Sequence, residues 1–179
     1  MLIPRLLRAA ALDPRAYEGI GEQPEDMFRA LGVVMVVGIA FSVGVRALPG
    51  IDFGDTPPLS AVLVSLSTVM TGWIVYTAVI YVLGTLVFRG KAGFRQILRT
   101  LGIAYGPGVV IVLGAIPSVG GFFFFIGLIW ILPSALFAVK SVQEFDWVRR
   151  FIVTAVGWVV ALAILPGYLL LGATASSPA

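Results

Sequence analysis

The sequence predicts an all-α, polytopic integral membrane protein with five transmembrane helices. Of its 179 residues, 59% are hydrophobic and only 12% are charged, which is about half the charged share of a soluble domain. The apolar residues form long uncharged runs, and about 20 such residues cross a bilayer as a helix. Eleven of the twelve Lys and Arg residues fall on one side of the five-span layout, which predicts a cytoplasmic N-terminus and an outside C-terminus.

Residues 1–27 are expected to form a cytosolic or interfacial segment. Residues 4–12 place apolar side chains on one helical face, which favours a short amphipathic helix in the interface. A disordered cytosolic tail is the alternative. Residues 13–26 carry five carboxylates. Because the helix dipole is positive at its N-terminus, these carboxylates predict the start of a helix here.

The first two spans are predicted at residues 28–48 and 59–88. Arg29 and Arg46 lie near the ends of the first span, where long side chains can reach the headgroups. The second run is uncharged for thirty residues. Since this exceeds the length that crosses a bilayer, the helix must tilt or project beyond the hydrocarbon.

A basic loop after the second span is the candidate cytosolic docking surface, together with the acidic N-terminal segment. Its cations are Arg89, Lys91, Arg95 and Arg99. Apolar residues recur at helical spacing from Phe94 to Leu101. This pattern predicts an amphipathic interfacial helix that leads into the next span.

The uncharged stretch at residues 101–139 is too long for one span. As a helix it would be ~60 Å long, about twice the thickness of the hydrocarbon core. The sequence Pro117-Ser118-Val119-Gly120-Gly121 supplies a turn, so spans three and four are predicted at residues 101–117 and 119–139. A re-entrant hairpin would also return the chain to the cytoplasmic side, and that alternative stays open. The fifth span is predicted at residues 151–172, with a disordered tail at 173–179.

The side chains on which most enzymes and metal sites depend are missing. The chain has no Cys and no His, which excludes disulfides, thiolate chemistry and the common zinc sites. No ionisable side chain lies at the centre of a predicted span, and this disfavours ion-coupled transport. The sequence predicts no catalytic residue, no metal site and no cofactor, and it shows no basic stripe of the kind that binds nucleic acid.

The second predicted span carries a polar stripe at helical spacing. Its members are Ser60, Ser67, Thr71 and Thr85. The stripe could line a pore or a path for lipid headgroups. It could also supply hydrogen bonds between packed helices, where Ser and Thr are common, and this second interpretation is preferred.

Gly and Pro residues mark candidate helix breaks and close helix contacts. The sharpest break is Gly106-Pro107, preceded by Gly102 at GxxxG spacing, because Pro removes a backbone hydrogen bond and Gly lets helices approach. Such a break could surround a substrate site, but close packing with a kink is preferred. The full set is Gly102, Tyr105, Gly106, Pro107, Pro117, Pro133 and Pro166. Gly157 and Ala161 form another small-residue face.

Several short stretches resemble one family of membrane proteins. They are residues 12–18, 94–102 and 104–107, Ile116-Pro117, Trp130, and residues 138–145. In this order they are similar to prokaryotic members of the Yip-domain family (Ypt/Rab-interacting proteins) over nearly the whole chain. The resemblance implies five spans and a cytosolic N-terminus. Eukaryotic relatives are linked to Rab GTPases, vesicle trafficking and membrane shaping. Their aspartate-led Gly-Pro signature has no clear counterpart here, so Rab binding is not carried over.

The sequence favours a non-enzymatic membrane protein that organises or assists other proteins through helix–helix and lipid contacts. Its expected partners are the lipid bilayer and other membrane proteins or a second copy of itself, in the cytoplasmic membrane of a prokaryote. The alternative is a small permease or lipid-handling protein that uses the Pro107 break and the polar stripe. A solvated cavity lined by Ser67, Thr71 and Tyr105 would favour that alternative. A membrane-embedded enzyme is a third hypothesis, which the absence of Cys and His disfavours.

Overall fold

The computed structural model describes residues 8, 12, 13, 17, 19, 20, 23–46, 48 and 57–174, with side chains described as far as residue 163. Within these ranges every regular element is a helix. The elements are α2 (Asp26–Val45), α3 (Pro58–Ile80), the π-helix η2 (Tyr81–Val87), α4 (Phe94–Ala104), the 3-10 helix η3 (Gly106–Ala115), α5 (Gly120–Gln143) and α6 (Trp147–Thr174). For the part of the chain that is described, the all-α prediction is confirmed.

Helix α2 begins where a carboxylate meets the helix N-terminus. Asp26 is buried in the first turn and accepts a hydrogen bond from Nη1 of Arg29 at 2.8 Å. A carboxylate in this position interacts favourably with the helix dipole. Val34, Val37 and Phe41 recur at helical spacing and are buried in the bundle. The opposite face of α2 is also apolar but exposed, as expected for a helix with protein on one side and lipid on the other.

Helices α3 and η2 form one continuous rod of 30 residues. Pro58 occupies the first turn, where its missing N–H has no intrahelical role. The last seven residues wind as a π-helix, and the backbone N–H of Gly90 returns to the carbonyl of Gly84 at 2.9 Å. Arg89, with φ of 58°, turns the chain at this point. The rod therefore ends in the basic loop that begins at Arg89.

Helices α4 and η3 form a pair bent by 40° at Tyr105. The amphipathic character expected of this region is present in α4, but Ile97, Leu98 and Leu101 are buried because α4 packs against α2, α3 and α5. Its apolar face therefore meets protein rather than the membrane interface. Beyond the bend the chain continues through Pro107 as a 3-10 helix to its end at Ala115.

A tight turn joins η3 to α5. Pro117 is exposed in this turn, Ser118 adopts a left-handed φ of 70°, and the N–H of Gly120 donates to the carbonyl of Ile116 at 2.8 Å. A Cβ on Gly120 would lie 1.9 Å from the carbonyl oxygen of Gly114, so the close return of the chain requires glycine. Helix α5 then runs without interruption through the interior proline at position 133.

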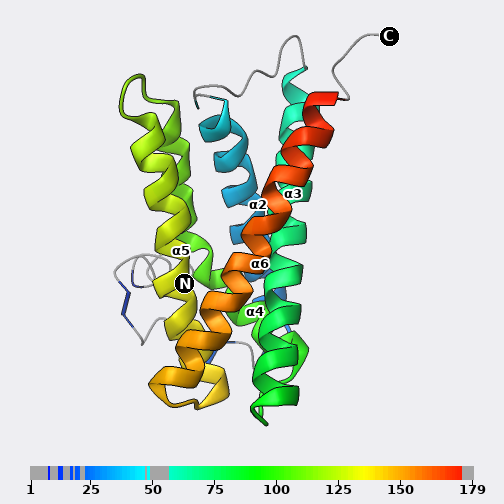
Figure 1. Ribbon diagram of the computed structural model, residues 1–179, viewed down its shortest axis with the longest axis vertical. Helices are drawn as coiled ribbons and strands as arrows, with labels where there is room; N and C mark the ends of the chain where they lie inside the picture. Colours follow the sequence, from blue (N-terminus) through cyan, green and yellow to red (C-terminus); the bar gives the residue numbers. More distant parts are fainter. Residues whose placement is uncertain are drawn as a thin grey trace.

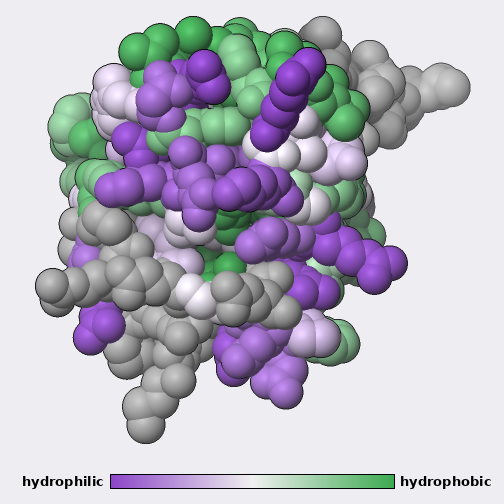
Figure 2. All heavy atoms as spheres, turned by 90° about the horizontal axis from the view of Figure 1, so that it is seen from below, coloured by the Kyte–Doolittle hydropathy of each residue, from purple (hydrophilic) through white to green (hydrophobic). Residues whose placement is uncertain are grey.

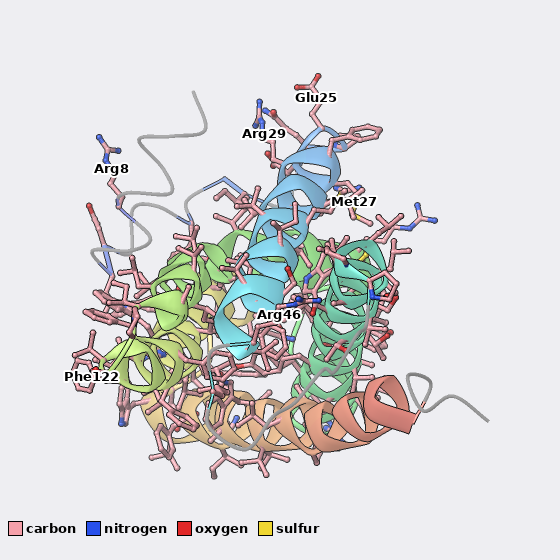
Figure 3. The ribbon with its side chains drawn as sticks, turned by 90° about the horizontal axis from the view of Figure 1, so that it is seen from above. Arg8, Glu25, Met27, Arg29, Arg46 and Phe122 are labelled. Atoms are coloured by element: carbon pink, nitrogen blue, oxygen red, sulfur yellow. The ribbon has the colours of Figure 1, made fainter. Side chains whose placement is uncertain are left out.

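The helices run alongside one another between two ends (Figure 1). The end of α2, the start of α3 and the η3–α5 turn lie at the upper end, while the end of η2 and the α5–α6 turn lie at the lower end (Figure 1). Hydrophilic side chains gather on the lower face (Figure 2). Arg46 lies at the opposite end of α2 from Glu25 and Arg29 (Figure 3). The bundle is thus polar at one end and apolar along its sides.

Three helices in the described ranges are long and apolar enough to cross a membrane: α2, the α3–η2 rod and α5. The bent α4–η3 pair makes a fourth if it counts as one span. The fifth predicted span falls on α6, which has 28 residues. Its side chains are described only as far as residue 163. The described residues therefore support a polytopic membrane protein with three or four spans.

Candidate functional site

The helix break at residues 102–107 combines a close helix contact with a bend. A Cβ on Gly102 would lie 2.5 Å from the Cβ of Ala30 and 3.2 Å from the ring of Trp73. Gly102 therefore lets α4 lie directly on α2 and α3. The indole Nε1 of Trp73 donates to the carbonyl of Leu98 at 3.1 Å and holds the same contact. Pro107 is buried and Gly106 is half-buried just beyond the bend.

Tyr105 lines a small cavity at this break. The cavity has a volume of about 50 Å³ and lies between α2, α3, η3, α5 and α6. Its walls are mainly apolar, and Tyr105 and Thr68 contribute the two hydroxyl groups. The Thr68 hydroxyl is already bonded to the carbonyl of Val64 at 2.8 Å. A space of this size and polarity would hold a few methylene groups and does not form a polar route across the bundle.

The remaining candidate prolines lie in three different settings. Pro117 is exposed in the turn at the upper end, and Pro133 is half-buried inside a continuous α5. Pro166 falls inside α6, in the stretch whose side chains lie outside the described part. The structure therefore brings Gly102, Tyr105 and Pro107 together at one bend, whereas Pro117 lies in the turn before α5 and Pro133 lies within α5.

The polar stripe does not face a common space. Ser67 is exposed, while Thr71 is half-buried, and the Ser60 hydroxyl bonds the carbonyl of Pro57 at 2.7 Å near the start of α3. A solvated cavity lined by Ser67, Thr71 and Tyr105 was the sign expected of a permease. Of these three residues, Tyr105 lines the observed cavity. The neighbouring Thr68 lines it in place of Ser67, since the rotation of α3 about its axis turns Ser67 outward.

Thr85 fastens the basic loop to the end of α5. Its hydroxyl donates to the carbonyl of Ala92 at 2.9 Å and accepts from Nε2 of Gln143 at 3.1 Å. A Cβ on Gly90 would lie 1.8 Å from Oε1 of Gln143, and one on Gly84 would lie 2.8 Å from Nε2. The two glycines therefore make room for the buried Gln143 side chain.

The four docking cations differ in their surroundings. Arg89 and Arg95 are exposed, and Arg99 is half-buried. Lys91 forms an exposed ion pair with Glu144 at 3.2 Å, and exposed pairs of this kind contribute little stability. The loop presents Arg89 and Arg95 at the polar end of the bundle.

Tyr17 and Ile20 of the N-terminal segment pack into the bundle, a contact that was not predicted from the sequence. Tyr17 and Ile20 are buried. The Tyr17 hydroxyl hydrogen-bonds to the hydroxyl of Ser134 in α5 at 2.5 Å, and the Thr100 hydroxyl donates to the carbonyl of Ile20 at 3.3 Å. Burial, opposed by the hydrogen bond to Ser134, raises the pKa of Tyr17 to about 12. The signal in the sequence was the presence of two large apolar residues, Tyr17 and Ile20, within the otherwise mostly polar stretch at residues 13–26. The proposed amphipathic helix at residues 4–12 lies largely outside the described residues.

Glycines also make further close helix contacts. A Cβ on Gly157 of α6 would lie 2.8 Å from the ring of Tyr76, so the small-residue face at Gly157 and Ala161 packs on α3. A Cβ on Gly44 would lie 2.2 Å from the carbonyl oxygen of Ile111. This α2–η3 contact was not among the sequence-based candidates.

The described acidic residues form no group of three or more that could hold a metal ion. Glu144 pairs with Lys91 and Asp146 pairs with Arg149. Asp52 and Asp55, in the loop after α2, lie outside the described residues. The described part of the chain therefore offers helix contacts, a small apolar cavity and a polar end as its functional features.

Residues 9–169 match the family profile described as the Yip1 domain. The match covers nearly the whole chain. The chain belongs to the Yip1 domain family. This confirms the resemblance inferred from the short motifs, and the match together with the apolar helices shows an integral membrane protein. Neither curated proteins nor solved structures gave a match to the chain.

Proposed function

We propose that this Yip1-domain chain is a non-enzymatic accessory or organising protein that acts through helix–helix and lipid contacts. The observation that carries the proposal is the division of its surface. The described outer faces of the helices expose large apolar side chains such as Phe28, Phe122 and Ile129, whereas the hydrophilic side chains gather at one end (Figure 2). Such a surface suits contact with lipid and with other membrane proteins.

The proposal includes a topology of five spans with the N-terminus in the cytoplasm and the C-terminus outside. Helix α6 at ~1.5 Å per residue is long enough to cross, and the cations of the basic loop lie at the polar end with Lys140, Arg149 and Arg150. Under the positive-inside rule that end faces the cytoplasm. We place the protein in the cytoplasmic membrane of a prokaryote.

A second candidate function is the handling of lipid or another apolar small molecule at the Pro107 break. The observation that favours it is the cavity beside Tyr105. Its apolar walls would accept part of an acyl chain. They would not lower the barrier for a polar solute.

The test is purification of the full chain from its native host in mild detergent, with mass spectrometry of bound proteins and lipids. A variant carrying Arg89→Gln and Arg95→Gln is compared with Arg46→Gln, which changes a cation at the opposite end. A stoichiometric protein partner that is retained by Arg46→Gln and lost from the double variant supports the accessory role. Absence of any protein partner, with one selectively retained lipid, would replace it by the lipid-handling candidate.

A further inference from the structure

Arg150 is a buried cation for which the described residues provide no counter-ion. Its residue surface is 8% exposed, and its Nε has no hydrogen-bond partner. The two carboxylates that precede it in the sequence are engaged elsewhere, since Asp146 pairs with Arg149 at 3.2 Å and Glu144 pairs with Lys91. A charge withdrawn from water without a partner is costly. A bound anion would therefore offset the cost of burying the Arg150 charge.

The first turn of α6 adds to the positive potential around Arg150. This turn contains no acidic residue, although Asp146 precedes it. The first amides of a helix lack partners within the helix, and together with the dipole they attract anions. Side chains on a helix lean towards its N-terminus. The Arg150 guanidinium accordingly lies 4.9 Å from the centre of the Trp147 ring, over this same turn.

One more unpartnered polar atom lies close to Arg150 along the chain. Thr154 is fully buried and its Oγ1 has no partner. It lies one turn after Arg150, on the same face of α6. Because buried polar groups are normally satisfied, the unpartnered Nε of Arg150 and the unpartnered hydroxyl of Thr154 together indicate a site for a ligand that accepts hydrogen bonds.

We propose that Arg150 and the first turn of α6 bind one phosphate-type oxyanion, supplied either by a phospholipid headgroup or by free phosphate. The guanidinium offers a planar fork of donors that matches two phosphate oxygens, and the helix amides bind a further oxygen. Thr154 supplies a hydroxyl on the same face. The inference deepens the proposed function. It rests on that function because it requires this end of the bundle to contact lipid headgroups.

Arg149 provides a matched control for the role of Arg150. It is adjacent in the chain and carries the same charge, but its side chain is 57% exposed and already paired with Asp146. The full chain is purified and delipidated in nonionic detergent. Native mass spectrometry then follows its titration with phosphatidylglycerol and with diacylglycerol, which lacks phosphate. A parallel titration with inorganic phosphate follows the tryptophan emission of the chain.

We expect one phosphatidylglycerol per chain and little diacylglycerol. Arg150→Gln should weaken that binding about tenfold or more, the factor that corresponds to ~1.4 kcal/mol, while Arg149→Gln should change it less than about threefold. Phosphatidylglycerol binding without a response to phosphate assigns the site to a lipid headgroup. A response to phosphate alone, abolished by Arg150→Gln, assigns it to the free ion.

Equal losses in both variants, equal binding of diacylglycerol, or no binding of either oxyanion source would overturn the proposal. If Arg150→Gln does not fold, Arg150→Lys keeps the charge and removes the planar fork, and unchanged phosphatidylglycerol affinity in that variant would count against the site. A negative result would leave the protein-partner experiment untouched, because that experiment depends on Arg89 and Arg95.

Discussion

At the residue scale, Gly102 is a position where a single methyl group would disturb the contact of α4 with α2 and α3. Its Cβ would meet the Cβ of Ala30 at 2.5 Å, and neither atom can rotate away. We expect Gly102→Ala to destabilise the bundle by about 1–3 kcal/mol through overpacking. Gly32→Ala is the control, because nothing lies within 4 Å of that position. Thermal unfolding in detergent, followed by tryptophan fluorescence, measures both variants, and equal stability of the two would contradict the contact.

Tyr17 gives the docking of the N-terminal segment a measurable pH dependence. Its pKa is raised by burial from 10.0 to about 12, so the neutral phenol is the form that the folded state favours. The resulting stability is fully present below pH 10 and is lost as the pH rises towards 12, with a total of roughly 3 kcal/mol.

We therefore expect the wild-type chain to lose stability between pH 10 and 12 more steeply than Tyr17→Phe. At neutral pH the variant should be less stable by about 1 kcal/mol, because it lacks the hydrogen bond to Ser134. Tyr81→Phe is the matched control, because it removes a phenol hydroxyl from a half-buried tyrosine. Parallel pH curves for the wild type and Tyr17→Phe would refute the assignment.

At the scale of elements, Thr85 decides whether the basic loop stays fastened to α5. Thr85→Val removes the bonds to Ala92 and Gln143 and keeps the shape of the side chain. Losing two bonds of this kind should raise the population of the open loop about tenfold. Limited proteolysis with trypsin, which cuts after Arg89 and Lys91, should speed up by a similar factor. Ser67→Ala removes an exposed hydroxyl from the same rod and should cut at the wild-type rate. Unchanged cleavage in Thr85→Val would show that the loop is held by other contacts.

Local signals in the sequence predict where elements end, but they do not predict contacts between residues that are far apart in the chain. Pro107 and the Pro117–Gly121 stretch change the backbone within a few residues, so their effects can be predicted from neighbours alone. The Tyr17–Ser134 bond joins residues 117 positions apart, and no local pattern specifies it. Ser67 and Thr68 could not be sorted into exposed and buried either. The lipid-facing side of α3 is as apolar as its protein-facing side, so hydropathy does not fix the rotation of the helix.

At the scale of the whole molecule, the α4–η3–α5 hairpin determines how many times the chain crosses. Helix α5 has 24 residues, and at ~1.5 Å per residue it is longer than the ~30 Å hydrocarbon core. Its start lies at the same end as the end of α2 and the start of α3 (Figure 1). A full crossing therefore places Val119 at the membrane face where Arg46 lies, opposite to Lys91.

The absence of cysteine from the chain makes this topology directly testable. Val119→Cys, Arg46→Cys and Lys91→Cys are each treated with a membrane-impermeant maleimide in intact and in permeabilised cells. With the polar end in the cytoplasm, we expect Val119→Cys and Arg46→Cys to react in intact cells and Lys91→Cys only after permeabilisation. Protection of Val119→Cys in intact cells, while Arg46→Cys reacts, would instead identify a re-entrant hairpin and reduce the count of spans by two. Because α6 starts at the end of the bundle that carries Lys91 in either case, the result leaves the outward direction of the last span unchanged.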